Sequence, residues 1–361
     1  LSITADFYQR TTRDMIGPAE SIPSISGIAS DDRAKVNNAT LRNRGWELSV
    51  SWNDKLKCGF SYGIGFNVFN YKAVVTKYNN PEGIIYNNHT GLAANKGYYE
   101  GMDIGEIWGY RADDLFLSNR EIDDYLRNVN LTAFKSNDLW RRGDLKYIDS
   151  NGDGRVDGGK GTLADHGDLQ IIGNTTPKYS FGINLNLGYK GFEISTLLQG
   201  VAKRDFPISG SNYMFGGNNY NFKEHLDYFS TENPNGYLPR LTGWKDDKDF
   251  LVNTGYNTTR YLLNAAYMRM KNLTVGYTFN KKQLRHIGIS NLKVYVTCDN
   301  LFTVTKLPKQ FDPETLNQVN MSAGGDAQNA APGLTSPMKQ NGNGMVYPMN
   351  RNFVFGLDFT F

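Results

Sequence analysis

Apolar residues recur at every second position along several stretches of this sequence. Between residues 179 and 189 every odd position is apolar, and every even position is Ser, Gly or Asn. Alternation with a period of two residues is typical of a β-strand with one apolar face. The same pattern predicts further strands at 1–10, 46–53, 58–68, 191–202, 266–279, 292–299 and 353–361. We therefore expect eight strands, with a β-bulge between Met270 and Leu273, where the apolar phase slips.

The connections between these strands alternate between short and long. Short turns are expected at Asp54-Lys55 and at Lys190-Gly191, whereas the loops rich in Gly, Asn, Asp and Tyr span 11–38, 73–177, 203–264 and 304–349. Short turns on one side and long loops on the other are typical of outer-membrane barrels. The sequence therefore predicts an all-β fold, a transmembrane antiparallel β-barrel with long extracellular loops.

A soluble β-sandwich is the alternative. Its solvated face usually carries Lys and Glu, but the face opposite the apolar one is here rich in Gly, Ser and Asn. Aromatic residues near the expected strand ends are also typical of the girdles at the two membrane interfaces; they are Trp46, Trp52, Tyr71, Tyr189 and Tyr277. Both features favour the barrel over the sandwich.

Composition excludes some classes and leaves others open. The net charge of +3 is too close to balance to indicate a nucleic-acid partner. The mean hydropathy of −0.51 does not exclude a barrel, since alternating strands average out as polar. The sequence contains no apolar run of about 18 residues, so it does not predict a membrane-spanning helix. The first residue is Leu1 rather than Met, so we expect a segment that begins within a longer protein, and we expect Cys58 and Cys298 to be unpaired.

Several short motifs follow one another in an order that resembles the SusC/RagA-like TonB-dependent outer-membrane transporters of the Bacteroidetes. No single motif is specific, but their order and spacing run through nearly the whole chain. They are Asn43-Arg44-Gly45-Trp46-Glu47-Leu48, Gly101-Met102-Asp103-Ile104-Gly105-Glu106-Ile107-Trp108-Gly109-Tyr110, Gly143-Asp144-Leu145-Lys146-Tyr147, Ile172-Gly173-Asn174, Pro177-Lys178-Tyr179, Arg269-Met270-Lys271-Asn272-Leu273, Gly276-Tyr277-Thr278-Phe279, Asn300-Leu301-Phe302-Thr303 and Asp312-Pro313-Glu314.

The resemblance implies a role in nutrient import across the cell outer membrane. Barrels of this class have about 22 strands and a plugged lumen, so residues 1–361 would form the C-terminal part of the barrel, with the plug domain outside this chain. The family pattern implies a SusD-like surface lipoprotein as partner, TonB-ExbB-ExbD acting through the absent N-terminal part, and uptake of oligosaccharides or oligopeptides. A barrel or surface binding protein that does not transport is the alternative.

The sequence contains no recognisable group of catalytic residues. The four histidines, His89, His166, His225 and His286, are scattered, and no motif of a metalloprotease or of a serine hydrolase is present. We therefore expect no enzyme activity.

One stretch, Asp149-Ser150-Asn151-Gly152-Asp153-Gly154-Arg155-Val156-Asp157, has the spacing of a calcium-binding loop. Such loops take oxygen ligands from positions 1, 3, 5, 7, 9 and 12, with Gly at position 6. The first five ligands would be Asp149, Asn151, Asp153, the Arg155 carbonyl and Asp157. Position 12 is Lys160, so the closing acid is expected later, at Asp168 or, second, at Asp165. The alternative is a turn without metal, held by its own hydrogen bonds.

The long loops raise two further expectations. We expect 73–177, 203–264 and 304–349 to form the rim that seats the lipoprotein, because they are far longer than the connection needs. Loop aromatic residues either stack on sugar rings, or pack the loops or contact the lipoprotein; they are Tyr213, Phe215, Tyr220, Phe222, Tyr228 and Trp244. The final strand is expected to end on the periplasmic side, with the odd positions from Phe353 to Phe361 facing lipid.

Overall fold

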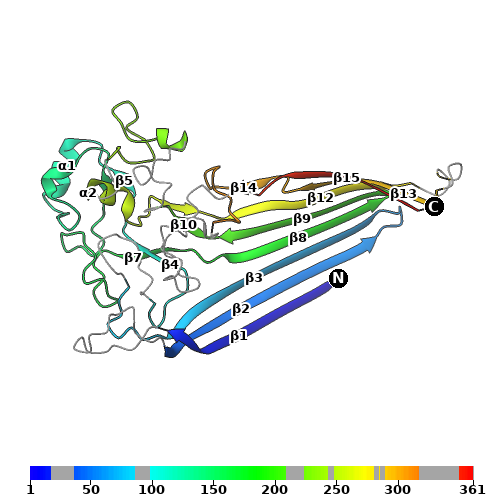
Figure 1. Cartoon of the computed structure of the whole chain (residues 1–361), viewed down its shortest axis with the longest axis horizontal. Coiled ribbons are helices and arrows are strands. Elements are labelled where there is room, and N and C mark those ends of the chain that lie inside the picture. Colours follow the sequence, from blue (N-terminus) through cyan, green and yellow to red (C-terminus); the bar gives the residue numbers. More distant parts are fainter. Residues whose placement is uncertain are drawn as a thin grey trace.

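The computed structural model shows a long antiparallel sheet with a cap of folded loops at one end (Figure 1). The structure describes residues 1–17, 36–85, 98–208, 223–242, 248–279, 284, 289–316 and 349–360. Among these residues no helix has the length and apolar character that a membrane span requires.

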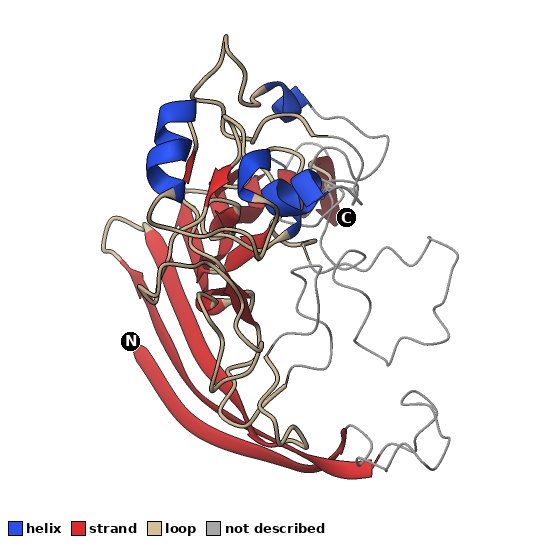
Figure 2. Ribbon diagram, turned by 90° about the vertical axis from the view of Figure 1, so that its left-hand side faces the viewer, coloured by secondary structure: helices blue, strands red, loops and turns tan. Residues whose placement is uncertain are grey.

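Eight long strands follow one another across the sheet in chain order. They are β1 (Ser2–Gly17), β2 (Val36–Lys55), β3 (Ser61–Lys77), β8 (Lys178–Tyr189), β9 (Phe192–Lys203), β12 (Tyr267–Thr278), β13 (Asn291–Asp299) and β15 (Asn352–Thr360). Every neighbouring pair is antiparallel, and β14 (Thr303–Thr305) pairs with β12. The expected eight strands are confirmed. β1 and β15 form the two edges of the sheet, which is strongly curved in the view from the cap end (Figure 2).

The short turns lie at the end of the sheet opposite the cap, where the C-terminus also lies (Figure 1). The predicted turn at Lys190-Gly191 is confirmed, and both residues have the positive φ, 46° and 92°, of a tight hairpin. The other predicted turn is wrong by a few residues. β2 continues through Asp54 and Lys55, and the chain turns at Leu56–Phe60, where Phe60 accepts a hydrogen bond from the Leu56 N–H. Cys58 therefore lies exposed in this turn, not in a strand.

The first three strands are much longer than their alternation predicted. β1, β2 and β3 have 16, 20 and 17 residues, whereas a strand needs only about 9–11 residues to cross a bilayer. The predicted loops 11–38 and 73–177 are therefore shorter than expected, because 11–17, 36–38 and 73–77 are strand. These strands continue beyond a membrane's thickness and join the sheet to the cap.

The cap consists of the long connections, which have regular structure of their own. Its helices are α1 (Asn119–Leu126), α2 (Lys248–Phe250), the 3₁₀ helices η3 (Asn137–Leu139) and η4 (Lys223–Leu226), and the π-helix η5 (Leu251–Gly255). Three small sheets join β4 (Glu106–Gly109) to β7 (Gln170–Asn174), β5 (Asp114–Leu115) to β6 (Leu145–Lys146), and β10 (Asp205–Pro207) to β11 (Leu262–Asn264). The loops are thus a folded unit rather than simple connections.

Candidate functional site: the two faces of the wall and the outer cap

The register of the strands gathers the apolar positions on one face of the sheet. One row runs Ile3, Val50, Phe66, Ile183, Leu198, and another runs Leu187, Ile194, Val275, Val296, Phe355, each residue opposite the next. The predicted alternation is therefore confirmed across all eight strands. The predicted bulge is also confirmed, because the β9–β12 register shifts between Met270 and Asn272.

Aromatic contacts mark both ends of the apolar face. At the short turns, the ring of Phe192 lies 4.6 Å from that of Tyr277, and Tyr189 lies 6.4 Å from Phe60. Toward the cap, Trp46 lies 6.5 Å from Tyr179. One residue predicted for these girdles belongs elsewhere.

Tyr71 is that exception. It pairs with Gly45 on the polar face, and the Lys178 ammonium lies 5.7 Å from its ring. The reason is the alternation of the strand. The apolar residues of β3 have even numbers, and Tyr71 has an odd number, so it lies on the opposite face.

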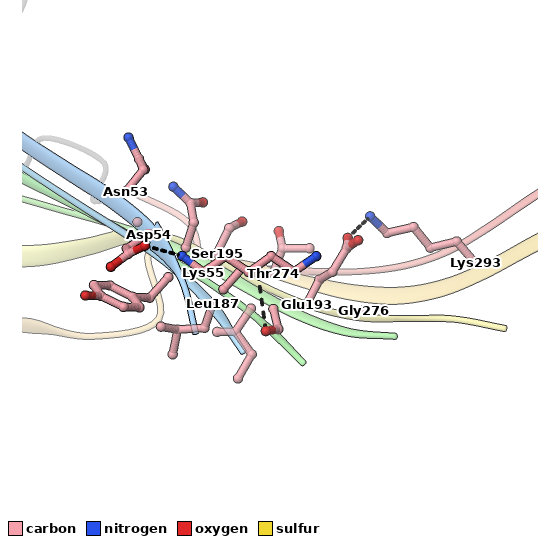
Figure 3. Close-up of a pocket in the computed structure, with 15 residues that line it drawn as sticks. Asn53, Asp54, Lys55, Leu187, Glu193, Ser195, Thr274, Gly276 and Lys293 are labelled. Atoms are coloured by element: carbon pink, nitrogen blue, oxygen red, sulfur yellow. Dashed lines mark hydrogen bonds and ion pairs between the residues drawn. The ribbon is translucent and has the colours of Figure 1, made fainter. Parts of the chain in front are cut away.

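The polar face carries a groove near the short turns (Figure 3). Its polar and small residues come from six neighbouring strands and include Asn53, Asp54, Lys55, Ser61, Gly63, Asn186, Glu193, Ser195, Thr274, Gly276 and Lys293. Lys293 and Glu193 form an ion pair across it at 2.5 Å. The groove has hydrogen-bonding groups of both signs, which suits contact with water or with a polar chain.

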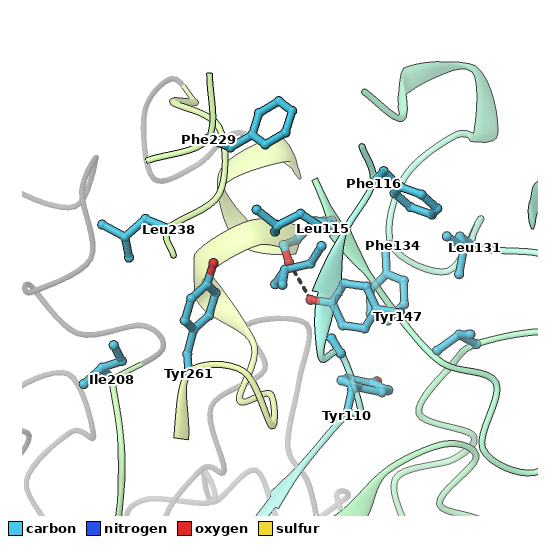
Figure 4. Close-up of a cluster of buried hydrophobic side chains, with 14 of the residues drawn as sticks. Tyr110, Leu115, Phe116, Leu131, Phe134, Tyr147, Ile208, Phe229, Leu238 and Tyr261 are labelled. Carbon is cyan, nitrogen blue, oxygen red and sulfur yellow. Dashed lines mark hydrogen bonds between the residues drawn. The ribbon is translucent and has the colours of Figure 1, made fainter. Parts of the chain in front are cut away.

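The cap has a hydrophobic core of its own (Figure 4). Aromatic rings from distant parts of the chain form its centre: Tyr147 stacks on Phe134 at 4.4 Å and meets Tyr110 edge-on at 5.6 Å. The Tyr147 hydroxyl donates to the Val252 carbonyl at 2.5 Å. Tyr228 packs against this core, whereas the other loop aromatics considered above lie outside the described residues. The core orders the loops that would otherwise have no fixed geometry.

Beside this core lies a network of two cations and two anions. The Lys135 ammonium lies 2.7 Å from Asp144 and 2.6 Å from Asp249, and Arg240 contacts the same two carboxylates at 2.6 and 2.5 Å. Asn253 donates to Asp144 at 2.8 Å and accepts from the Leu145 N–H at 2.9 Å. The side chains of Lys135 and Asp144 are fully buried, so the pairing is needed to keep their charges.

The network changes the acidity of Asp249. Burial acts to raise the pKa of this carboxyl, but hydrogen bonds from Lys135 and Arg240 and their charges outweigh burial and lower the pKa below its ordinary value. The ionised form of Asp249 is therefore the one that stabilises the cap.

A second ionic group joins two motifs that the sequence showed only as separate signals. Arg269 of β12 contacts Asp312 at 2.9 Å and Glu314 at 3.2 Å, and Lys271 contacts Glu314 at 2.9 Å. Asp312 also accepts from the Met349 N–H at 3.0 Å, where the chain returns to β15. The two motifs carry opposite charges, which is compatible with this contact. They lie far apart in the sequence, however, so the sequence alone did not predict it.

The Asp-rich loop is closed by hydrogen bonds to its own backbone. Asp149 accepts from the N–H groups of Gly152 at 2.6 Å and Gly154 at 2.8 Å, and both glycines have the positive φ that this turn requires. Asn151 accepts from Asp153 at 2.9 Å. The remaining predicted ligands follow the same pattern: Asp153 accepts from Arg155, and Asp157 accepts from Gly159, both at 2.8 Å.

Asp168 lies against this loop, whereas Asp165 does not. The buried Asp168 carboxylate accepts from the N–H groups of Ser150 at 2.6 Å, Asn151 at 3.3 Å and Asp157 at 2.9 Å, so it joins both ends of the loop. Burial is the main cause that raises the pKa of Asp168, and the charge of Asp149 adds to it. Asp165 instead closes the turn 160–165 through its backbone carbonyl.

These oxygens are of the kind that calcium binds, but they face backbone N–H groups rather than one central point. Among the residues that the structure describes, no three Asp, Glu, His or Cys side chains form a group that could hold a metal ion. A carboxylate offers about four lone-pair sites, so the hydrogen bonds leave capacity for a cation. The geometry is therefore that of an Asx-rich turn whose donor set is compatible with calcium.

Comparison with known proteins agrees with this architecture. No family model matches the chain. It is 25% identical over 317 residues to the TonB-dependent receptor P3 of Formosa agariphila, covering 87% of this chain and 29% of that receptor. It is 21% identical over 321 residues to the TonB-dependent receptor SusC of Bacteroides thetaiotaomicron, covering 87% of this chain and 28% of SusC. The chain is thus similar in sequence to the SusC/RagA-like TonB-dependent receptors.

A solved structure, that of the RagAB peptide transporter, shares the fold of this SusC/RagA-like chain. It superposes with a TM-score of 0.62 at 22% identity and covers 99% of this chain and 33% of that one. The chain thus has the fold of part of an outer-membrane β-barrel transporter, and it spans about a third of the length of the proteins it matches. Its relatives are receptors and transporters rather than enzymes.

Proposed function

We propose that this chain forms part of the wall and the outer cap of a TonB-dependent importer that takes up oligosaccharides or oligopeptides. The observation that carries the proposal is the two-faced sheet, apolar on one side and polar on the other, topped by folded loops. A barrel of this kind turns its apolar face to lipid and its polar face to the lumen. The short turns and the C-terminus would then lie on the periplasmic side.

Transport and surface binding differ in that only TonB-dependent transport requires the proton-motive force. Cells that express the full-length receptor should accumulate a labelled nutrient mixture of glycan and peptide oligomers, and a protonophore should abolish that accumulation. Binding to the cell surface should persist with the protonophore. If accumulation is insensitive to the protonophore, the chain belongs to a surface binding barrel, the alternative function.

We also propose that the cap seats a SusD-like surface lipoprotein. Two leucines of the cap, Leu226 and Leu241, are 73% and 54% exposed and offer apolar surface that a partner would cover. Deleting 210–250 is a poor test, since Phe229 and Leu238 of the cap core lie within that segment.

Point variants test the same contact without disturbing the core. Leu226→Asp with Leu241→Asp should reduce co-purification of the lipoprotein by about tenfold, since charge would be buried at the contact. Leu56→Asp is the matched control, because Leu56 is 47% exposed in the turn at the opposite end of the sheet. If the lipoprotein co-purifies equally with the wild type, the double variant and the Leu56→Asp control, Leu226 and Leu241 do not form the contact.

We further propose that the Asp-rich loop binds calcium as a structural ion. What supports it is the adjacency of Asp149 and the buried Asp168, whose mutual repulsion a cation would relieve. The ligands would be Asp149, Asn151, Asp153, the Arg155 carbonyl, Asp157 and Asp168. Outer-surface calcium sites are often weak, with dissociation constants of about 10⁻⁴–10⁻³ M.

The test is protease sensitivity of residues 140–175 with calcium and with chelator. Calcium should protect this segment in the wild type but not in Asp153→Ala, whose side chain is partly exposed and whose loss leaves the cap core intact. A wild type that is equally resistant in both solutions would mean that the loop is only a turn.

A further inference from the structure

A basic hollow of about 420 Å³ lies on the cap and shares no residue with the Asp-rich loop or with the groove of the polar face. Its lining residues are Asn119, Arg141, Arg142, Phe229, Ser230 and Arg240. Three of the six are arginines, and Asn119 and Ser230 add neutral polar groups. The hollow therefore offers hydrogen-bond donors around one aromatic ring.

The backbone that carries two of these arginines is held in place. In the turn Arg141–Asp144, the Arg141 N–H donates to the Asp144 carboxylate at 2.8 Å, and the Arg240 N–H donates to the Gly143 carbonyl at 2.9 Å. Gly143 has a φ of +85°, and a Cβ there would lie 2.3 Å from the Phe229 ring. The turn thus rests directly on Phe229, and the buried Asp144 fixes it from below.

The charge in the hollow is not balanced. Arg240 and Lys135 carry two positive charges, and Asp144 and Asp249 carry two negative ones, so that network is neutral. Among the residues that the structure describes, the Arg141 side chain donates to two backbone carbonyls, those of Asp138 and Trp140. In the described part of the chain neither Arg141 nor Arg142 forms an ion pair, which leaves two positive charges in the hollow without a carboxylate.

Paired guanidinium groups bind oxyanions, because their planar arrays of N–H donors match the oxygens of a carboxylate or a sulfate. The ring of Phe229 adds an apolar surface beside them. We propose that this hollow binds the carboxylate or sulfate group of an anionic oligomer. That this oligomer is the imported nutrient rests on the function proposed above; the binding itself does not.

Calorimetry on the purified full-length receptor tests the site directly. The probes are glucuronate and galactose 6-sulfate for glycans, an N-acetylated tetrapeptide of neutral side chains with a free C-terminus for peptides, and glucose and the same acetylated tetrapeptide amidated at its C-terminus as uncharged counterparts. We expect an anionic probe to bind more tightly than its counterpart, and the affinity to fall as salt is raised. The glycan and peptide arms distinguish the source of the anionic group.

Variants connect that binding to the hollow. Arg142→Gln should weaken binding of the anionic probe by roughly five- to tenfold, as expected for the loss of one charged hydrogen-bonding partner. Arg127→Gln is the matched control, since Arg127 is exposed just after the end of α1 and pairs with Asp124 outside the hollow. Unchanged affinity in Arg142→Gln, equal loss in both variants, or equal binding of charged and uncharged probes would each overturn the proposal. Uptake is measured separately, so failure here leaves the import function standing.

Discussion

At the scale of single residues, a few buried charges decide whether the cap holds its shape. Asp144 accepts hydrogen bonds from Lys135, Arg240, Asn253 and the Arg141 backbone, so it lies at the meeting point of four segments. A buried ion of this kind is costly unless every partner is present. The cap should therefore be sensitive to the loss of any one of them.

Replacing Lys135 tests this sensitivity. Lys135→Met should lower the free energy of unfolding of the cap by about 3–5 kcal/mol, since removal of one partner leaves buried carboxylates undercompensated. Lys146→Met is the control, because its pair with Glu121 is about a third exposed on each side and should cost about 1 kcal/mol or less. The measurement is denaturant unfolding followed through limited proteolysis of 110–160. Similar losses in the two variants would contradict the role of the buried network.

The same residues predict how the cap responds to acid. The pKa values of Asp249 and Asp312 are lowered against the effect of burial by their Arg, Lys and backbone partners. A carboxyl with a lowered pKa stabilises the fold when the pH is above the ordinary pKa of 3.8. That stability is lost as the pH falls through the lowered pKa.

Asp168 has the opposite sign. Its pKa is raised, so protonation as the pH falls removes a destabilising charge from the metal-free loop. Hydrogen exchange between pH 6 and pH 3 should therefore show 248–253 losing protection before the chelated 149–168 loop does. The reverse order would contradict this assignment.

At the scale of elements, the hairpin turns depend on glycines for two separable reasons. Gly191 has a φ of 92°, and a Cβ there would lie 2.6 Å from the Thr278 carbonyl oxygen. Gly59 has a φ of 88°, but no atom lies within 4 Å of its Cβ position. The two glycines thus share the backbone strain that a side chain would bring, but only Gly191 adds a steric clash.

Alanine substitution at both positions separates these effects. Gly59→Ala should cost about 1–2 kcal/mol from the left-handed backbone alone, and Gly191→Ala should cost more, because the clash is with backbone that cannot move aside. The thermal unfolding of the barrel in detergent measures both. Equal costs would show that the β8–β9 turn shifts away from Thr278.

At the scale of the whole molecule, the register predicts which residues contact lipid. Phe355 is 79% exposed on the apolar face, and Val354, its neighbour, is 48% exposed on the other. Gly356 is unsuitable as a probe of the polar face, because a Cβ there would lie 2.1 Å from the Tyr295 ring. Val354 is therefore the probe of the polar face.

In a variant without Cys58 and Cys298, single cysteines at the two positions report on the environment. Phe355→Cys should react with a lipid-phase reagent, and Val354→Cys with a water-soluble one, in the full-length receptor within its membrane. Reversed labelling would mean that β15 is shifted by one residue, since such a slip exchanges the two faces of a strand.

The order of residues was enough to predict the eight-stranded sheet of this protein. Alternation is local, because neighbouring side chains of a strand always point to opposite faces, and so the eight strands and the β12 bulge could be read from residue order. The ends of the strands were harder to predict from the sequence. The extensions beyond 1–10 and 46–53 depend on pairing with a partner strand rather than on their own alternation.

The tertiary structure alone decided the cap. Lys135 meets Asp249 across 114 residues and Arg269 meets Asp312 across 43, and no periodic pattern along the chain marks such contacts. The basic hollow likewise combines residues from 119, 141–142, 229–230 and 240, whose individual positions resemble ordinary polar loops. Contacts between distant segments form only when the loops pack around Tyr147 and Phe134, and packing of that kind depends on shape in three dimensions rather than on spacing along the sequence.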